Sequence, residues 1–294
     1  MDSNSKAILK TLLYADLFDY PLTKDEVYRF LISEKSINRN ELLNALKKHD
    51  LPIEESEGYL YLIGREELVE KRKKREEVSR RKLEFAKKII NKISFIPSIK
   101  LIGISGGLSM KNCDADDDID LFVITDKGFA WTTRFLLVAL LTIRGIYRNR
   151  NSKNHSNKIC LNMLLDESRI EFIKPNKDLY TAHEIVQLLT VFNKGKSYEK
   201  FINANVTWVK NFIPNFEINT NISSHKNNFL DKLILYIFRI MRLENLFRFL
   251  QLNYMKSHKT REVAEVGFLK FHPYDYKIHV LKEYEGRLSK MGYN

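Results

Sequence analysis

Three segments near the N-terminus have apolar side chains at every third or fourth position, a spacing that predicts amphipathic helices. The first helix is expected over Ala7–Phe18, and Pro21 ends it. Thr23 and Glu26 have the T-x-x-E spacing of a capping box, which predicts the start of the second helix. Asn40 is the expected cap of the third.

Two short runs rich in apolar residues follow, Ile53–Glu54 and Tyr59–Leu62, on either side of a turn at Glu57–Gly58. They predict a small hairpin. Three helices and a hairpin within residues 1–64 have the layout of a winged helix, a fold that often binds nucleic acid through its third helix. Dimerisation or internal packing is the alternative role for this unit.

A long charged helix is expected from Glu66 to about Ile93, within a basic connecting segment over residues 65–98. Lysine and arginine interleave with glutamate at i,i+4 distances, so part of the charge is expected to be paired within the helix. Two interpretations stay open. The basic side chains either form a solvated helix face or contact nucleic acid or phosphate.

Strands and one helix alternate over residues 99–175, which we interpret as a core domain with a small mixed sheet. The helix is expected over Trp131–Ile146. Each strand is predicted from an apolar run between turn signals. The expected strands are Lys100–Ser105, Ile119–Thr125, Ile159–Leu165 and Arg169–Ile173.

From Tyr180 onward the pattern is helical, so residues 176–294 are expected to form a C-terminal helical region and the whole chain an α+β fold. This region contains an apolar stripe at helical spacing. The stripe consists of Leu230, Leu233, Ile234, Ile237, Met241, Phe247 and Leu250. Packing against other helices is the favoured interpretation, and contact with a membrane is the alternative.

The composition of the chain limits which binding partners and which cellular compartment are expected. The formal net charge of +12 favours anionic partners such as nucleic acid, triphosphates or an acidic membrane surface. The two cysteines form no CxxC pair, which suits a reducing cytoplasm and argues against a structural zinc site. The first residues are polar, so no signal peptide is expected, and the apolar run Phe135–Ile143 is too short to span a bilayer. A cytoplasmic protein without a membrane partner is expected.

The candidate chemistry lies within Leu101–Thr125. A predicted strand leads into Gly106 and Gly107, and Asp118 and Asp120 follow after ten intervening residues. Side chains two apart on a strand share a face, so the two carboxylates are expected to lie together, where a cation would relieve their repulsion. Carboxylate oxygens suit Mg²⁺ or Mn²⁺. The glycines allow backbone N–H groups to approach a phosphate closely.

This pattern resembles the core motif of the DNA polymerase beta-type nucleotidyltransferase superfamily: a glycine, a second glycine or a serine, a loop of this length, and Asp-x-Asp in an apolar strand. Over most of its length the chain also resembles prokaryotic proteins that join an N-terminal winged helix to such a domain. The wider resemblance rests on four segments. They are Leu17–Thr23, Lys158–Asn162, Leu179–Ala182 and Phe271–Pro273.

The resemblance implies transfer of a nucleoside monophosphate from a nucleoside triphosphate to an acceptor hydroxyl. Asp118 and Asp120 would be catalytic and would bind two Mg²⁺ or Mn²⁺ ions. A loop would hold the terminal phosphates of the nucleotide. Its residues are Ser105, Gly106, Gly107 and Ser109. A small molecule, a tRNA end and a protein side chain all stay open as the acceptor.

One position departs from the superfamily pattern, which usually has a third carboxylate on a later strand. Asn162 stands where that acid is expected; its carbonyl oxygen can bind a metal, but it cannot act as a base. Glu171 has the expected apolar flanks and would replace the acid if its strand lies beside the second strand. The alternative function is a nucleic-acid-binding regulator with a degenerate, non-catalytic nucleotidyltransferase domain.

The acidic loop before Asp118 has two other interpretations. Its alternating aspartates mimic the start of an EF-hand, but Ile119 and Thr125 occupy the positions of the required glycine and the bidentate acid. A solvated loop, with Asp114, Asp116 and Asp117 facing water, is favoured over a calcium site.

Overall fold

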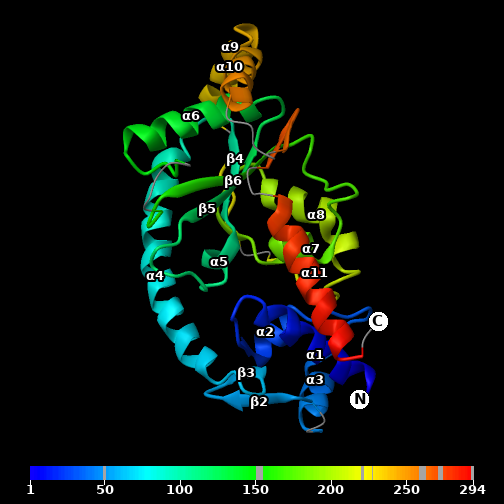
Figure 1. Ribbon diagram of the computed structural model, residues 1–294. Coiled ribbons are helices and arrows are strands. Elements are labelled where there is room, and N and C mark those ends of the chain that lie inside the picture. The colour runs from blue at the N-terminus through cyan, green and yellow to red at the C-terminus, as the bar shows by residue number, and fades with distance from the viewer. Residues whose placement is uncertain are drawn as a thin grey trace.

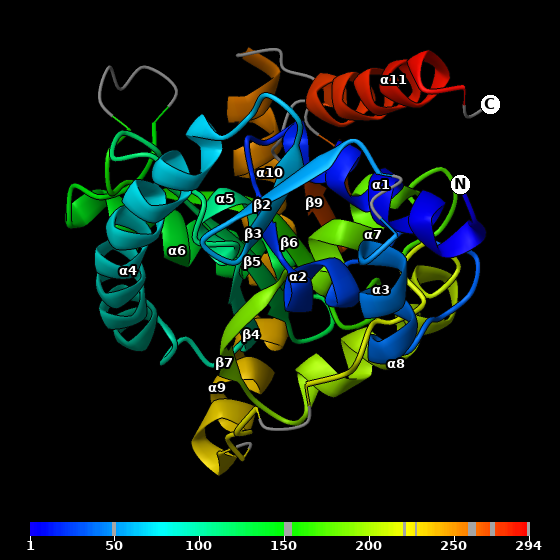
Figure 2. The ribbon, with the colours of Figure 1, turned by 90° about the horizontal axis from the view of Figure 1, so that it is seen from below.

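The computed structural model describes residues 1–48, 51–149, 155–219, 222–226, 228–257, 263–270 and 274–292. Its helices surround two sheets, so the expected α+β class is confirmed (Figure 1, Figure 2). The smaller sheet has three antiparallel strands in the order β1-β3-β2. The larger sheet is mixed and has six strands in the order β7-β4-β5-β6-β9-β8.

The N-terminal unit contains three helices and the smaller sheet. Its elements are α1 (Ser3–Asp16), β1 (Leu22–Thr23), α2 (Lys24–Arg29), α3 (Arg39–Leu46), β2 (Ile53–Ser56) and β3 (Tyr59–Leu62). The capping box of Thr23 and Glu26 forms as predicted. The predicted cap of the third helix is wrong, because Asn38 and not Asn40 caps α3. Asn38 has Glu41 three residues later, and the two form a reciprocal capping box.

A single helix, α4 (Glu67–Ile93), leads from the N-terminal unit to the larger sheet, as predicted (Figure 1). Arg72 joins its first half to the N-terminal unit. The Arg72 guanidinium donates to the carbonyl of Pro21 at 2.7 Å and to the carboxylate of Glu26 at 2.8 Å. It also lies over the ring of Tyr20, 4.0 Å from the centroid. These buried contacts fix α4 against the N-terminal unit.

The larger sheet is built around β5. The elements of this part are β4 (Ile99–Ile104), α5 (Gly106–Ser109), β5 (Ile119–Thr125), α6 (Ala130–Ile143) and β6 (Ile159–Asp166). β4 runs antiparallel to β5, whereas β6 runs parallel to it because α6 makes the crossover. Alternate side chains of β5 enter two different cores, Leu121 and Val123 on one face and Phe122 and Ile124 on the other.

The predicted strand Arg169–Ile173 is wrong, since this segment has no regular structure. A side chain of α8 (Ser197–Val209) satisfies its backbone: the Oδ1 atom of Asn205 accepts from the N–H of Phe172 at 3.0 Å, and the Nδ2 atom donates to a nearby carbonyl at 2.8 Å. The edge of β6 is instead paired with β9 (Phe268–Lys270). No place beside β5 or β6 is left for the predicted strand.

The prediction of a purely helical C-terminal region is corrected as well. It also contributes strands to the larger sheet. Besides α8 and β9 its elements are α7 (Leu179–Val186), β7 (Leu189–Asn193), α9 (Phe229–Ile240), α10 (Leu243–Ser257), β8 (Val263–Glu265) and α11 (Tyr274–Lys290). β7 pairs with β4 and β9 pairs with β6. Among the described residues, no helix combines the length and the apolar character needed to cross a bilayer. The segment Phe271–Pro273 lies outside the described residues.

The apolar stripe predicted to pack against other helices is largely exposed, so that prediction is wrong. In α9 only Leu235 is buried, whereas Leu230 is 60% exposed and Met241, just after the helix, is 61% exposed. One member of the stripe does pack, since the ring of Phe247 on α10 stacks on Phe135 of α6 with centroids 4.1 Å apart. The remaining apolar surface faces outward.

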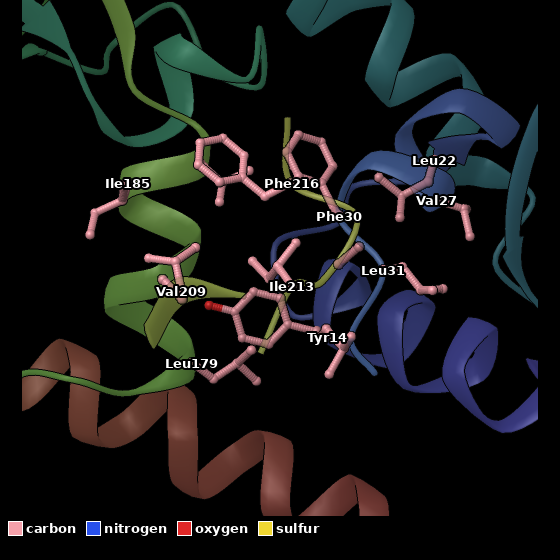
Figure 3. Packing of buried hydrophobic residues seen from close by; sticks show 14 of the residues in the cluster. Tyr14, Leu22, Val27, Phe30, Leu31, Leu179, Ile185, Val209, Ile213 and Phe216 are labelled. Atoms are coloured by element: carbon pink, nitrogen blue, oxygen red, sulfur yellow. The ribbon is translucent and has the colours of Figure 1, made fainter. Parts of the chain in front are cut away.

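One hydrophobic core joins the N-terminal unit to the larger domain. Figure 3 shows side chains of the N-terminal unit against side chains of α7, α8 and the segment that follows α8. They include Tyr14, Phe30, Leu179, Ile185, Val209 and Ile213. Because this core is shared, the N-terminal unit holds a fixed position over one face of the larger sheet.

Candidate metal and nucleotide site

The carboxylates of Asp118 and Asp120 lie together on one side of β5, as the strand alternation predicts. Asp118 directly precedes the strand, Asp120 is its second residue, and Ile119 between them is buried in the core on the opposite face. Both aspartates are half-buried. The Oδ2 atom of Asp118 lies 2.7 Å from Nη1 of Arg148, so the two residues form an ion pair.

Cys160 joins the two carboxylates, although the predicted ligand set does not contain it. It lies opposite Asp120 in the parallel pairing of β5 with β6. Its Sγ atom and one carboxylate oxygen each from Asp118 and Asp120 all lie within 4.8 Å of one another. A sequence signal did exist: Cys160 is two residues before Asn162, so both side chains are expected on the same strand face.

The charges around Cys160 favour its protonated thiol. Burial, followed by the carboxylates of Asp120 and Asp118, raises the pKa of this thiol well above its usual value. The guanidinium of Arg148, 3.7 Å from the sulfur, lowers the pKa but is outweighed. For Arg148 itself burial lowers the pKa, and the neighbouring Asp118 more than compensates, so the guanidinium stays charged. Among the described residues, two carboxylates and one guanidinium therefore lie together at this site.

The turn after β4 lies against these carboxylates. The backbone N–H of Ser105 donates to the carbonyl of Asp120 at 3.0 Å, which ties the turn to β5. Gly106 has a φ of +66°, and Gly107 follows it without a Cβ. The hydroxyl of Ser109 donates to the carbonyl of Gly106 at 2.7 Å and so closes the turn. The four predicted phosphate-binding residues therefore form one turn beside the carboxylates.

The two candidates for the missing third acid lie in different places. Asn162 is buried on β6, and its Nδ2 atom donates to the Ser105 hydroxyl at 3.0 Å. Glu171 lies outside the sheet, its side chain is 61% exposed, and it pairs with Lys177 at 3.1 Å. The expectation that Glu171 lies beside β5 is therefore wrong, for the same reason that its predicted strand is absent.

The acidic loop before Asp118 is a structural turn. The carboxylate of Asp114 accepts two hydrogen bonds from Arg75 of α4, at 2.7 and 3.0 Å. Its backbone N–H donates to the carboxylate of Asp117 at 2.8 Å. Asp116 is exposed. Asp114 and Asp117 are exposed as well, which agrees with the interpretation as a solvated loop.

A cavity of about 570 Å³ opens between the N-terminal unit and the larger sheet. Ser105, Gly106, Gly107 and the Asp118–Asp120 pair lie along one wall, whereas Ser109 does not line the cavity. The other walls are largely aromatic and apolar. They include Tyr14, Phe18, Phe30, Tyr180 and Tyr276. The two aspartates thus face a cleft between the N-terminal unit and the larger sheet.

One further carboxylate, Glu184 of α7, lines the same cavity and is not among the predicted site residues. Tyr180 lies one turn earlier on this helix. Burial raises the pKa of its phenol, and the carboxylates of Glu184 and Asp120 raise it further, so the hydroxyl stays a neutral hydrogen-bond donor. The helical spacing of Tyr180 and Glu184 is visible in the sequence, but the packing of α7 against the sheet is not.

Comparisons of the chain with family models, with curated proteins and with solved structures each found no match. The function is therefore argued from the site itself.

Proposed function

We propose that the chain is a nucleotidyltransferase that moves a nucleoside monophosphate from a nucleoside triphosphate to an acceptor hydroxyl. One observation carries the proposal. Asp118, Asp120 and Cys160 have ligand atoms within 4.8 Å of one another, and the two aspartates line a cavity of about 570 Å³ together with Gly106 and Gly107. The order of strand, glycine pair and Asp-x-Asp strand is the one that the resemblance implies.

The donor set fits a divalent cation. Two carboxylates supply oxygen ligands and negative charge. The buried Oδ1 atom of Asn162 accepts no hydrogen bond from the described residues, so a neutral oxygen is available two residues along β6 from Cys160. Oxygen donors suit Mg²⁺ or Mn²⁺, and the sulfur of Cys160 would become a ligand only on loss of its proton. A bound cation would neutralise triphosphate charge and favour departure of pyrophosphate.

The chain's own residues would position the nucleotide. The Gly106–Gly107 turn would let backbone N–H groups approach a phosphate without a Cβ in the way. Arg148 carries a charge that suits a phosphate oxygen. Transfer forms a bond from the acceptor oxygen to the α-phosphorus and breaks the bond to pyrophosphate. Asp118 or Asp120 would accept the proton that the acceptor hydroxyl releases.

We also propose that the N-terminal unit is a winged helix, because it has three helices followed by a hairpin, and the short strand β1 between the first two helices pairs with that hairpin. Its shared core with α7 and α8 supports the packing role over a free nucleic-acid-binding domain. The third helix, α3, still exposes Asn40, Asn44 and Lys47. Two of its cations are paired, Arg39 with Asp25 and Lys48 with Asp2, which leaves α3 only weakly basic.

A second candidate function is nucleotide sensing without transfer. The observation that favours it is the hydrogen bond from Asn162 to Ser105. At the position of the expected third acid, the chain thus has a side chain that supports the turn. In this alternative the same cavity binds a nucleoside triphosphate, and the exposed surface of α3 contacts nucleic acid.

Two measurements separate these functions. Isothermal titration calorimetry with each nucleoside triphosphate and Mn²⁺ or Mg²⁺ should show binding that is lost in Asp118→Asn and Asp120→Asn. Asp116→Asn, an exposed acid of the same loop, is the matched control and should bind as the wild type does. Incubation with α-phosphate-labelled triphosphates and cell lysate should then label an acceptor. Binding without labelling would favour the sensor, and unchanged binding in both site variants would exclude this site.

A further inference from the structure

The hairpin of α9 and α10 lies at one end of the molecule, far from the N-terminal unit (Figure 1). It presents large apolar side chains to solvent. The most exposed are Phe229 at 76%, Tyr254 at 68%, Ile240 at 63%, Phe249 at 63%, Tyr236 at 62%, Met241 at 61% and Leu230 at 60%. A contiguous apolar surface of this kind is unusual on a monomer and indicates an interaction site.

The apolar face of α9 points away from the body of the protein. Asp231, Leu235 and Phe238 are at least half-buried, and their spacing of four and three residues places them on the inward face. Leu230, Ile237 and their neighbours recur on the opposite side at the same helical spacing. A helix whose apolar face points outward gains nothing from this chain's own core, so an external partner must cover that face for burial to occur.

The charges of the hairpin are sorted between its inner and outer surfaces. Both acidic side chains face inward: Asp231 pairs with Lys194 at 3.2 Å, and Glu244 accepts from the backbone N–H groups that begin α6 at 2.9 Å. The exposed charged side chains among residues 228–255 are Lys232, Arg239 and Arg242, all basic. Arg239 also lies over the ring of Phe129 in the body of the protein, 5.5 Å from its centroid, so the exposed cations border the apolar outer surface.

We propose that the α9–α10 hairpin binds the surface of an anionic lipid bilayer. An apolar helix face bordered by lysine and arginine inserts among lipid headgroups, and the cations meet lipid phosphates. The 12 residues of α9 span about 18 Å, shorter than a bilayer core, so the helix would lie in the plane of the surface. The expectation of no membrane partner rests both on the short apolar run Phe135–Ile143 and on a packed stripe; no described helix could span a bilayer, but the stripe is exposed, and the proposal concerns contact with the bilayer surface only.

A second copy of this chain is the less suitable occupant. A two-fold symmetric interface would place the same surface on both sides. Lys232, Arg239 and Arg242 of one copy would then approach the same cations of the other, with no exposed carboxylate among the described residues of either hairpin to pair with them. An anionic bilayer would bury the apolar face and pair with the cations at the same time.

Cosedimentation of the full chain with vesicles tests the proposal. Vesicles of phosphatidylcholine with one part in three phosphatidylglycerol should bind the chain, and phosphatidylcholine alone should bind it at least about tenfold more weakly. Ile240→Glu should weaken binding to the anionic vesicles by about tenfold or more. Ile63→Glu is a matched control, since Ile63 is 61% exposed in the N-terminal unit and Ile240 is 63% exposed.

A second pair of variants tests whether binding to anionic vesicles requires the arginines of the hairpin. Arg239→Gln with Arg242→Gln should weaken binding to anionic vesicles several-fold, whereas Arg80→Gln with Arg81→Gln removes two exposed cations of α4 and should not. Equal binding to both vesicle types, or equal effects of Ile240→Glu and Ile63→Glu, would overturn the proposal. Self-association of the chain in sedimentation velocity that Ile240→Glu abolishes, without vesicle binding, would also overturn it in favour of a second copy. Binding to poly-glutamate without vesicle binding would do so in favour of an acidic protein.

Discussion

The carboxylate of Asp120 lies directly over the Cα atom of Gly106. A Cβ added to Gly106 would come within 2.9 Å of the Oδ2 atom of Asp120. The φ of Gly106 is +66°, a backbone conformation that residues other than glycine rarely adopt. Glycine is therefore required here for two reasons, and the first of them, the contact with Asp120, concerns the site itself.

Gly106→Ala is expected to displace the Asp120 carboxylate and to abolish binding of Mn²⁺-nucleoside triphosphate. Gly128→Ala is the matched control, because Gly128 has a φ of +76° but a Cβ added there would meet no atom within 4 Å. Both variants should lose about 1 kcal/mol of the free energy of unfolding through backbone strain. Calorimetry should separate them. Loss of nucleotide binding in both, or in neither, would contradict a specific contact between Gly106 and Asp120.

Cys160 is expected to set the metal preference of the site. Thiolate binds soft cations more strongly than hydroxyl does, so Cys160→Ser should weaken Cd²⁺ binding by about tenfold or more and change Mg²⁺ affinity far less. Cys113→Ser replaces the other cysteine, which is buried beside Ser79 at 3.1 Å between the two side chains. That control should leave both affinities unchanged. Ultraviolet charge-transfer absorption on Cd²⁺ addition reports sulfur ligation directly, and its persistence in Cys160→Ser would exclude this role.

Arg72 is expected to contribute strongly to stability. Its side chain is 4% exposed and pairs with Glu26 and Glu76, both at 2.8 Å. Arg72→Met would leave the partly buried Glu26 without its main partner, and the expected loss is about 3–5 kcal/mol of the free energy of unfolding. Arg80→Met removes an exposed arginine of the same helix and should cost less than about 0.5 kcal/mol. Urea unfolding of both variants gives the comparison.

Local patterns predict the elements well where the chain carries both a periodicity and a boundary signal. The Thr23–Glu26 capping box and the strand Ile119–Thr125 are examples, and the shared face of Asp118 and Asp120 follows from strand alternation alone. The predicted cap of α3 is two residues late because both Asn38 and Asn40 are suitable caps. The three-residue distance from Asn38 to Glu41 is the signal that distinguishes them.

Tertiary relationships are predicted less well, because they depend on which strands become neighbours. The segment around Glu171 has a strand-like apolar pattern, yet Asn205, 33 residues further along the chain from Phe172, satisfies its backbone. Cys160 enters the site through the parallel register of β5 and β6, which no local pattern specifies. The apolar stripe of α9 does lie on one face of the helix. Whether such a face meets the chain's own core or solvent cannot be read from periodicity.

A final prediction concerns His183, which lies on α7 and stacks on Tyr14 of α1 with ring centroids 4.2 Å apart. Burial lowers the pKa of His183 from 6.5 to about 3. Its Nε2 atom has no hydrogen-bond partner among the described residues, so a proton there would be buried without compensation. Between these two pKa values the unfolded chain binds a proton that the folded chain does not. The contribution of neutral His183 to stability is therefore fully present above pH 6.5 and is lost as the pH falls toward 3.

His183→Phe keeps a stacking ring and cannot be protonated. The free energy of unfolding of the wild type relative to His183→Phe should fall by about 1.4 kcal/mol per pH unit between about pH 6 and pH 4. Urea unfolding at several pH values in this range measures the slope. His279→Phe, at an exposed position of α11, is the control and should run parallel to the wild type. A His183→Phe curve that also runs parallel to the wild type would show that His183 gains its proton equally in both states. The stacked contact between α1 and α7 would then not depend on a neutral imidazole.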